Sequence, residues 1–168
     1  PVLIIWGLAG WWEWIKHLPN SFKKRIVSQT WAVSLILVSG LFWLRGGQAY
    51  GKDVAFIESE MVHMAKWVNR NLPQDAIVAA HDIGALGYFG GREIVDLAGL
   101  VSPDVIPIIR DEKALEGYLN EQDVDYLLTL RDWYPELEKQ AQLVYQSGGE
   151  FSPRLGGENM VLYQWPSP

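Results

Sequence analysis

Residues 26–44, IVSQTWAVSLILVSGLFWL, decide the architecture of this chain. The run is 19 residues long and uncharged. As a helix rising 1.5 Å per residue it extends about 28 Å, close to the hydrocarbon thickness of a bilayer. Trp31 and Trp43 lie near its borders, where indoles favour the headgroup region. The pattern predicts a transmembrane helix over 26–44. The alternative is a core helix of a soluble domain, because polar residues such as Gln29 dilute the hydrophobicity.

The flanking charges predict the orientation of this helix. Lys23, Lys24 and Arg25 precede the run, whereas Arg45 alone follows it directly. Basic residues are enriched on the cytoplasmic side of membrane helices, so we expect the chain after Arg45 to lie outside the cytoplasm. Residues 1–18 open with the apolar sequence PVLIIWGLAGWW, which predicts the end of a preceding membrane helix. We therefore expect a multi-pass protein of the cell membrane, with the lipid bilayer as a partner.

The charge balance changes near residue 52. Residues 1–52 carry six Lys/Arg and one acidic residue, whereas residues 53–168 carry eight Lys/Arg and 19 acidic residues, a net charge of −11. An acidic domain is a poor partner for nucleic acid, because binding requires basic surface that displaces counterions. The chain contains no Cys, which excludes disulfides and thiol chemistry. We expect 53–168 to form one extracytoplasmic domain, joined to the membrane helix by the linker Gly46–Gly51.

Helical and strand patterns alternate in this domain. Asp53–Leu72 has apolar residues at spacings of three and four, so it predicts a helix, which Pro73 ends. Further helices are predicted over Ile83–Phe89, Glu112–Asn120 and Tyr134–Gln140, and strands over Ala76–Ala80, Glu93–Leu97, Val124–Leu130, Leu143–Gln146 and Met160–Trp165. The expected fold class is α/β: one or two transmembrane helices followed by a small three-layer domain with a mainly parallel sheet. The pattern also allows an antiparallel hairpin at the end of the sheet.

The densest group of polar residues lies in 81–100, HDIGALGYFGGREIVDLAGL. His81 and Asp82 follow the first predicted strand and Asp96 lies near the end of the second, where open α/β sheets hold ligands. We expect these three residues to meet at one crevice. The alternative is structural: Asp82 caps the helix beginning at Ile83, and His81 bonds within a turn. Further metal ligands are not evident, so no metal and no cofactor is predicted.

Arg92 is a candidate for holding an anionic group of a substrate, with a surface ion pair to Glu93 or Asp96 as the alternative. The glycines around it resemble a phosphate-binding loop only loosely. Neither G-x-G-x-x-G nor G-x-x-x-x-G-K-[ST] occurs in the sequence. The glycines therefore predict close packing and a tight turn, and a soluble dinucleotide-binding enzyme is disfavoured.

Four stretches together resemble a known family; they are Trp67–Pro73, Ala76–Ala79, His81–Phe89 and Ile94–Val101. Their order is a helix, a strand, a glycine-rich turn and a strand ending in D-L-x-G-L. This order is similar to the C-terminal extracytoplasmic domain of bacterial polytopic glycosyltransferases of the dolichyl-phosphate-mannose-protein mannosyltransferase type, which have the C-type glycosyltransferase fold. The resemblance covers roughly residues 26–130, and none of its motifs is catalytic.

The resemblance implies a polyprenyl-phosphate-linked sugar as donor, a glycan or protein as acceptor, and transfer outside the cytoplasm. The catalytic acidic residue of that family lies in the first extracytoplasmic loop, so no catalytic residue is assigned to this chain. The tail domain would assist substrate recognition. The candidate substrate-binding residues are His81, Asp82, Tyr88, Arg92 and Asp96, and further aromatic faces are available from Phe89, Trp133 and Tyr134. A place in the core is the alternative for Tyr88 and Phe89. The alternative function is a non-enzymatic membrane-anchored ligand-binding or interaction domain.

Overall fold

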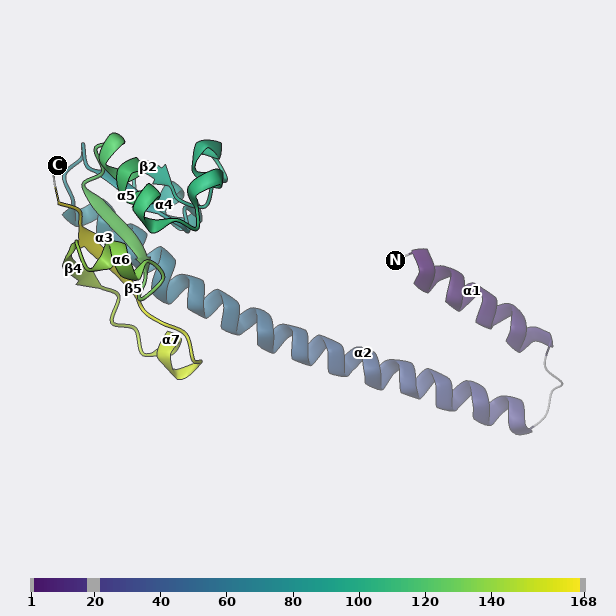
Figure 1. The fold of residues 1–168 in the computed structure, drawn as a ribbon. Coiled ribbons are helices and arrows are strands. Elements are labelled where there is room, and N and C mark those ends of the chain that lie inside the picture. Colours follow the sequence, from purple (N-terminus) through teal and green to yellow (C-terminus); the bar gives the residue numbers. More distant parts are fainter. Residues whose placement is uncertain (1, 18–21, 167–168) are drawn as a thin grey trace. The chain divides into compact units, whose positions relative to one another are not determined.

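A computed structural model describes residues 2–17 and 22–166; residues 1, 18–21 and 167–168 lie outside the described part of the chain. The chain divides into two compact units, residues 1–51 and 52–168, which are traced in Figure 1.

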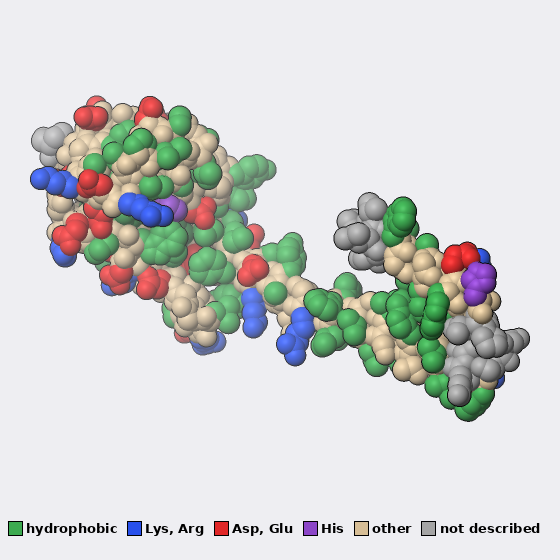
Figure 2. Space-filling view, turned by 45° about the vertical axis from the view of Figure 1, so that its right-hand side comes forward, with side chains coloured by type: hydrophobic (Ala, Val, Ile, Leu, Met, Phe, Trp, Pro, Cys, Tyr) green, Lys and Arg blue, Asp and Glu red, His purple; other side chains and the backbone are tan. Residues whose placement is uncertain are grey.

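The first unit is helical and largely apolar. It contains α1 (Val2–His17) and most of α2 (Phe22–Ile57), and the rings of Trp11 and Trp31 stack with centroids 4.3 Å apart. Among the described residues, one helical stretch, Arg25–Asn71, is long and apolar enough to cross a membrane by length and composition. None of the residues in its most apolar window is buried within the structure. Hydrophobic side chains are visible along this unit in Figure 2. The first and last residues of the predicted segment 1–18 lie outside the described residues.

The predicted linker at Gly46–Gly51 is wrong, because α2 continues through it to Ile57. Asp53 therefore lies inside the helix and does not cap a new one. Glycine within a helix costs about 1 kcal/mol relative to alanine, but it adopts helical dihedral angles without strain. The segment contains no proline that would end the helix, so it stays helical between two segments with stronger helical preference.

The second unit begins with the last turns of α2, followed by the π-helical turn η1 (Glu58–Val62) and α3 (His63–Asn71). The sheet contains β1 (Ile77–Ala80), β2 (Glu93–Asp96), β3 (Tyr126–Leu130), β4 (Gln142–Gln146) and β5 (Met160–Gln164). The other helices are α4 (Gly84–Phe89), the 3-10 helix η2 (Pro103–Ile108), α5 (Glu112–Glu121), α6 (Pro135–Glu138) and α7 (Phe151–Arg154). The unit is thus of α/β character, with a strand close to each of the five predicted positions.

The prediction of a mainly parallel sheet is wrong, because the sheet is mixed. Its strand order is β2-β1-β3-β5-β4. β1 pairs in parallel with β2 and β3, whereas β5 pairs antiparallel with β3 and β4. The connection from β4 to β5, residues 147–159, contains only the four-residue α7. The connection lacks the long helix that usually forms the crossover between parallel strands, and β4 and β5 pair as an antiparallel hairpin.

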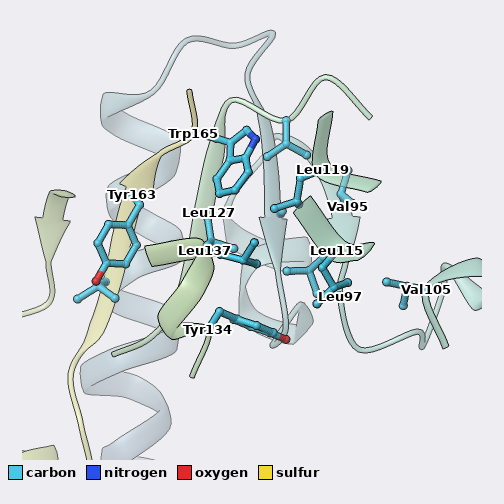
Figure 3. Packing of buried hydrophobic residues seen from close by; sticks show 13 residues of the cluster. Val95, Leu97, Val105, Leu115, Leu119, Leu127, Tyr134, Leu137, Tyr163 and Trp165 are labelled. Atoms are coloured by element: carbon cyan, nitrogen blue, oxygen red, sulfur yellow. The ribbon is translucent and has the colours of Figure 1, made fainter. Parts of the chain in front are cut away.

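Both faces of the sheet are buried. Leu127 and Leu128 of β3 point to opposite clusters of buried residues, and Val161 and Leu162 of β5 repeat this alternation. The first cluster is completed by side chains from α5 and α6, and the second by side chains from α3 and α4. Figure 3 shows the first cluster, with Trp165 at one end and Tyr134 at the other. The domain therefore has three layers, with helices on each face of the sheet.

The π-helical turn η1 turns an acidic side chain into the domain. Glu60 is fully buried, and its carboxylate accepts hydrogen bonds from the backbone N–H of Met160 at 2.9 Å, the amide of Asn159 at 3.0 Å and the hydroxyl of Ser147. All three donors belong to the β4–β5 hairpin or its connection. A π-helical turn inserts an extra residue into the helical repeat and re-aims the side chains that follow. Here it places Glu60 where it fastens the helix to the hairpin.

Candidate functional site

A crevice opens beyond the carboxyl ends of β1 and β2. Its volume is about 470 Å³, and it is lined by His81, Asp82, Ile83, Gly84, Ala98 and Leu100. The first four residues follow β1 and the last two follow β2. The carboxyl ends of adjacent parallel strands form a common edge, and the loops that leave that edge make a natural ligand site. The structure thus brings together two of the sequence-predicted residues, His81 and Asp82.

His81 is held by two aromatic residues that follow β3. Its Nδ1 lies 2.8 Å from the hydroxyl of Tyr134, and the ring of Trp133 meets its ring edge to face at 5.1 Å between centroids. β3 pairs with β1, so residues that follow the two strands lie at the same end of the sheet. The sequence offers Trp133 and Tyr134 as aromatic faces, but it does not predict the hydrogen bond between Tyr134 and His81. Only the pairing of β1 with β3 could have suggested it.

The Tyr134 phenol is buried beneath the crevice. Burial, together with the negative charges of Glu112 and Asp96, raises the pKa of Tyr134 to about 12, so the phenol keeps its proton at neutral pH. Among the described residues, His81 Nδ1 is the sole hydrogen-bond partner of the Tyr134 hydroxyl. In this hydrogen bond the phenol donates when the imidazole carries its proton on Nε2, and it accepts when the proton is on Nδ1.

Asp82 is half-buried and largely free. One carboxylate oxygen lies 3.4 Å from the backbone N–H of Gly84, the first residue of α4. This is a long hydrogen bond, and it leaves the second oxygen available to the crevice. The predicted capping of the helix by Asp82 is therefore limited to this one weak contact. The helix begins at Gly84, so Ile83 and not Asp82 occupies the cap position. Asp82 can accept a hydrogen bond from a ligand without releasing its backbone contact.

Asp96 supports the crevice from below and does not line it. Its side chain is fully buried and accepts hydrogen bonds from the backbone N–H groups of Ala98 at 2.8 Å, Val101 at 2.7 Å and Ser102 at 3.4 Å. Burial alone would raise the pKa of Asp96. The backbone hydrogen bonds, that of Val101 foremost, outweigh it and hold the pKa below its ordinary value of 3.8. The carboxylate therefore shapes the loop that carries Leu100.

Arg92 lies outside the crevice. Its guanidinium donates to the backbone carbonyls of Leu72 at 2.7 Å, Asn69 at 3.0 Å and Gly91 at 2.9 Å. The first two carbonyls belong to the end of α3, so Arg92 satisfies acceptors that the helix leaves open there. Among the described residues it forms an ion pair with neither Glu93 nor Asp96. The arrangement is that of a structural clamp.

Tyr88 and Phe89 differ in their surroundings. The side chain of Tyr88 is 83% exposed, so a core position is wrong for it, whereas Phe89 packs partly against the second cluster. Their rings meet edge to face at 4.6 Å between centroids. Tyr88 does not line the crevice. The apolar side chains that line the crevice include Leu100, which is 75% exposed. Trp133, which is 50% exposed, lies beside the crevice against the ring of His81. Within the described residues there is no cluster of three or more metal-ligating side chains.

Together these features define a class of protein: a three-layer α/β domain with an open crevice at its strand ends, in a chain whose apolar helix is long enough to span a bilayer. Residues 52–163 match a family described as a domain of unknown function, DUF8728, and the chain belongs to this family. The matched range coincides closely with the second structural unit. No curated protein and no solved structure gives a significant match to the chain.

Proposed function

We propose that this chain is the C-terminal part of an integral-membrane glycosyltransferase that uses a polyprenyl-phosphate-linked sugar, and that its α/β domain assists substrate recognition. The observation that carries the proposal is the crevice, where the imidazole of His81 and the carboxylate of Asp82 lie beside the apolar side chains of Leu100 and Trp133. A sugar ring needs both kinds of contact, because its hydroxyls form hydrogen bonds and its C–H faces pack against apolar groups. The resemblance of residues 26–130 to such enzymes supports the same class.

The proposal gives this chain a binding role and no catalytic one. Asp82 is the one carboxylate that lines the crevice, since Asp96 is committed to its own loop. A residue elsewhere in the longer protein would perform the transfer. The proposed partners are the lipid bilayer, the polyprenyl-phosphate sugar and a glycan or protein acceptor.

The proposed location is the cell membrane, in a multi-pass protein whose C-terminal domain lies outside the cytoplasm. The basic residues Lys23, Lys24 and Arg25 before the apolar run support this orientation. The chain has no Cys, so single cysteines report topology cleanly. A cysteine replacing Lys139, an exposed residue, should react with an impermeant maleimide on intact spheroplasts, and one replacing Ser21 should react after lysis alone. The reverse pattern would overturn the orientation.

The enzymatic part of the proposal is tested on the complete reading frame. We expect the coding sequence upstream of Pro1 to encode further membrane spans with an acidic residue in the first outer loop. In membranes containing the full protein, His81→Ala combined with Asp82→Asn should raise the KM for one substrate, measured as transfer of radiolabelled sugar from its polyprenyl-phosphate carrier. The control variant is Glu93→Gln, which removes an exposed charge at the opposite end of β2. A reading frame that begins within a few tens of residues of Pro1 would refute the proposal that the protein is a glycosyltransferase.

A second candidate is a non-enzymatic membrane-anchored ligand-binding or interaction domain. It is favoured by the exposed apolar side chains near the crevice, among which Val101 is 69% exposed next to Leu100. Exposed apolar patches on soluble domains often mark contacts with other proteins. Transfer activity that is insensitive to the crevice variants would favour this candidate for the domain.

A further inference from the structure

The crevice has an uneven charge. No Lys or Arg lines it, Asp82 contributes a carboxylate directly, and Asp96 adds a second negative charge beneath it. The nearby cation that the sequence offered for an anionic group, Arg92, is occupied by the carbonyls at the end of α3. A phosphate entering the crevice would meet a like charge with no compensating cation, at a partly buried site where solvent screens weakly.

The hydrogen-bonding groups of the crevice depend on the tautomer of His81. In the tautomer in which Nδ1 accepts from the Tyr134 hydroxyl, the remaining ring nitrogen, Nε2, carries the proton and is a donor. The free oxygen of Asp82 is an acceptor. A donor and an acceptor side by side match hydroxyl groups, each of which both donates and accepts. They match phosphate poorly, because a phosphate oxygen only accepts.

We propose that the crevice binds a neutral polyol, such as the hydroxylated ring of a sugar, and excludes the phosphate of a sugar carrier. The polyol would accept from His81 Nε2, donate to Asp82 and pack its C–H face against Leu100 and the exposed part of Trp133. Tyr134 acts as a positioning residue that fixes the imidazole tautomer. This inference rests on the proposed function and adds which part of the sugar-bearing molecules this domain holds: the neutral sugar of an acceptor or of the donor's head, away from the phosphate.

The test compares matched ligands on the whole 168-residue chain in lipid nanodiscs. The probes are mannose, glucose and galactose, each beside its own 1-phosphate, and binding is followed by saturation-transfer NMR. We expect at least one neutral sugar to bind, and its 1-phosphate to bind about tenfold more weakly because of the unscreened like charge. Asp82→Asn should weaken the neutral sugar about tenfold through the lost charged hydrogen bond, whereas the control Glu93→Gln should not change it. Asp82→Lys should reverse the preference between sugar and sugar phosphate.

A second measurement tests the polarity of the crevice without a ligand. In the 15N-labelled chain, the histidine side-chain NMR signal that disappears in His81→Gln should show the Nε2–H tautomer. Tyr134→Phe should allow both tautomers, because it removes the donor to Nδ1.

The outcomes separate the two levels of the proposal. If a 1-phosphate binds more tightly than its neutral sugar, or if His81 is found as the Nδ1–H tautomer, the inference about the crevice fails while a sugar-binding domain stands. If none of the six probes binds, both the inference and the recognition role under the proposed function fail.

Discussion

Glu60 offers the sharpest test of how the domain is held together. Its buried carboxylate accepts hydrogen bonds from three donors of the β4–β5 region and forms no ion pair within the described part of the chain. In Glu60→Ala, the buried N–H of Met160 loses its acceptor, whereas Asn159 keeps its second acceptor, the carbonyl of Gly149 at 2.8 Å, and the half-buried hydroxyl of Ser147 can turn toward water. One orphaned buried donor costs about 1–3 kcal/mol, and the lost bonds to a charged acceptor add to this. We expect a total loss of about 3 kcal/mol in the free energy of unfolding.

A loss of this size should lower the melting temperature of the domain by about 10 °C. The assay is urea and thermal unfolding of the chain in nanodiscs, followed by near-ultraviolet circular dichroism. Amide hydrogen exchange should show the largest loss of protection at Met160 and in the β4–β5 connection. Glu60→Gln should lose about 1–2 kcal/mol, because it retains one acceptor but turns an N–H₂ toward the donors.

The matched control is Glu58→Ala. Glu58 lies in the same π-helical turn, is exposed, and forms no side-chain hydrogen bond among the described residues. It should change stability by less than about 0.5 kcal/mol. A neutral surface substitution changes the free energy of unfolding by up to about 0.5 kcal/mol. If Glu60→Ala changes it by no more than this, Glu60 does not stabilise the contact between the helix and the β4–β5 hairpin.

Three further predictions concern other polar side chains of the domain. Asp96→Asn should destabilise the domain at pH 7. A carboxylate with a lowered pKa stabilises the fold above its unfolded pKa and ceases to do so once it is protonated, so the stability difference between the variant and the unsubstituted chain should shrink as the pH falls below 3.8. Unfolding free energies measured across pH check this prediction. Burial raises the pKa of Tyr134 and of Tyr163 to about 12. The charges of Glu112 and Asp96 add to this effect at Tyr134, and the hydrogen bond to Glu138 adds to it at Tyr163. The stability that the two protonated phenols contribute is complete below pH 10 and lost toward pH 12. An ultraviolet titration should therefore show two tyrosines that ionise only at high pH, together with alkaline unfolding. Ionisation of all tyrosines near pH 10 in the folded chain would contradict this prediction. Arg92→Lys should cost about 1–2 kcal/mol, since one ammonium cannot reach all three carbonyls, while sugar binding stays unchanged.

The fold was predictable where local pattern and final environment agree. The five strands lie close to their predicted positions. Short apolar runs between turn residues are more stable when they pair in a buried sheet than when they stay exposed to water. Strand direction was not predictable from the same runs. Residues 160–163, MVLY, form a continuous apolar run because β5 is covered on both faces. Such a run is typical of a parallel strand, yet an antiparallel strand in the middle of a covered sheet produces the same pattern.

The candidate site was predictable to the extent that it follows strand ends. His81 and Asp82 directly follow β1, so their place at the crevice follows from the layered fold. Asp96 follows the same rule but turns inward, because backbone N–H groups only two to six residues away compete for its oxygens. Arg92 is drawn to carbonyls that lie 20 and 23 residues earlier, a contact that depends on packing and leaves no local signal.

The position of β5 inside the sheet bears on how the domain is made in the cell. β5 is the last strand along the chain, yet it lies between β3 and β4 and supplies residues to both buried clusters. Until it emerges, β3 and β4 cannot be joined and each exposes an unpaired edge. During synthesis the sheet therefore cannot close until residue 165 has left the ribosome. A chain that terminates before β5 would lack the strand that joins β3 to β4, and both strands would keep an open edge.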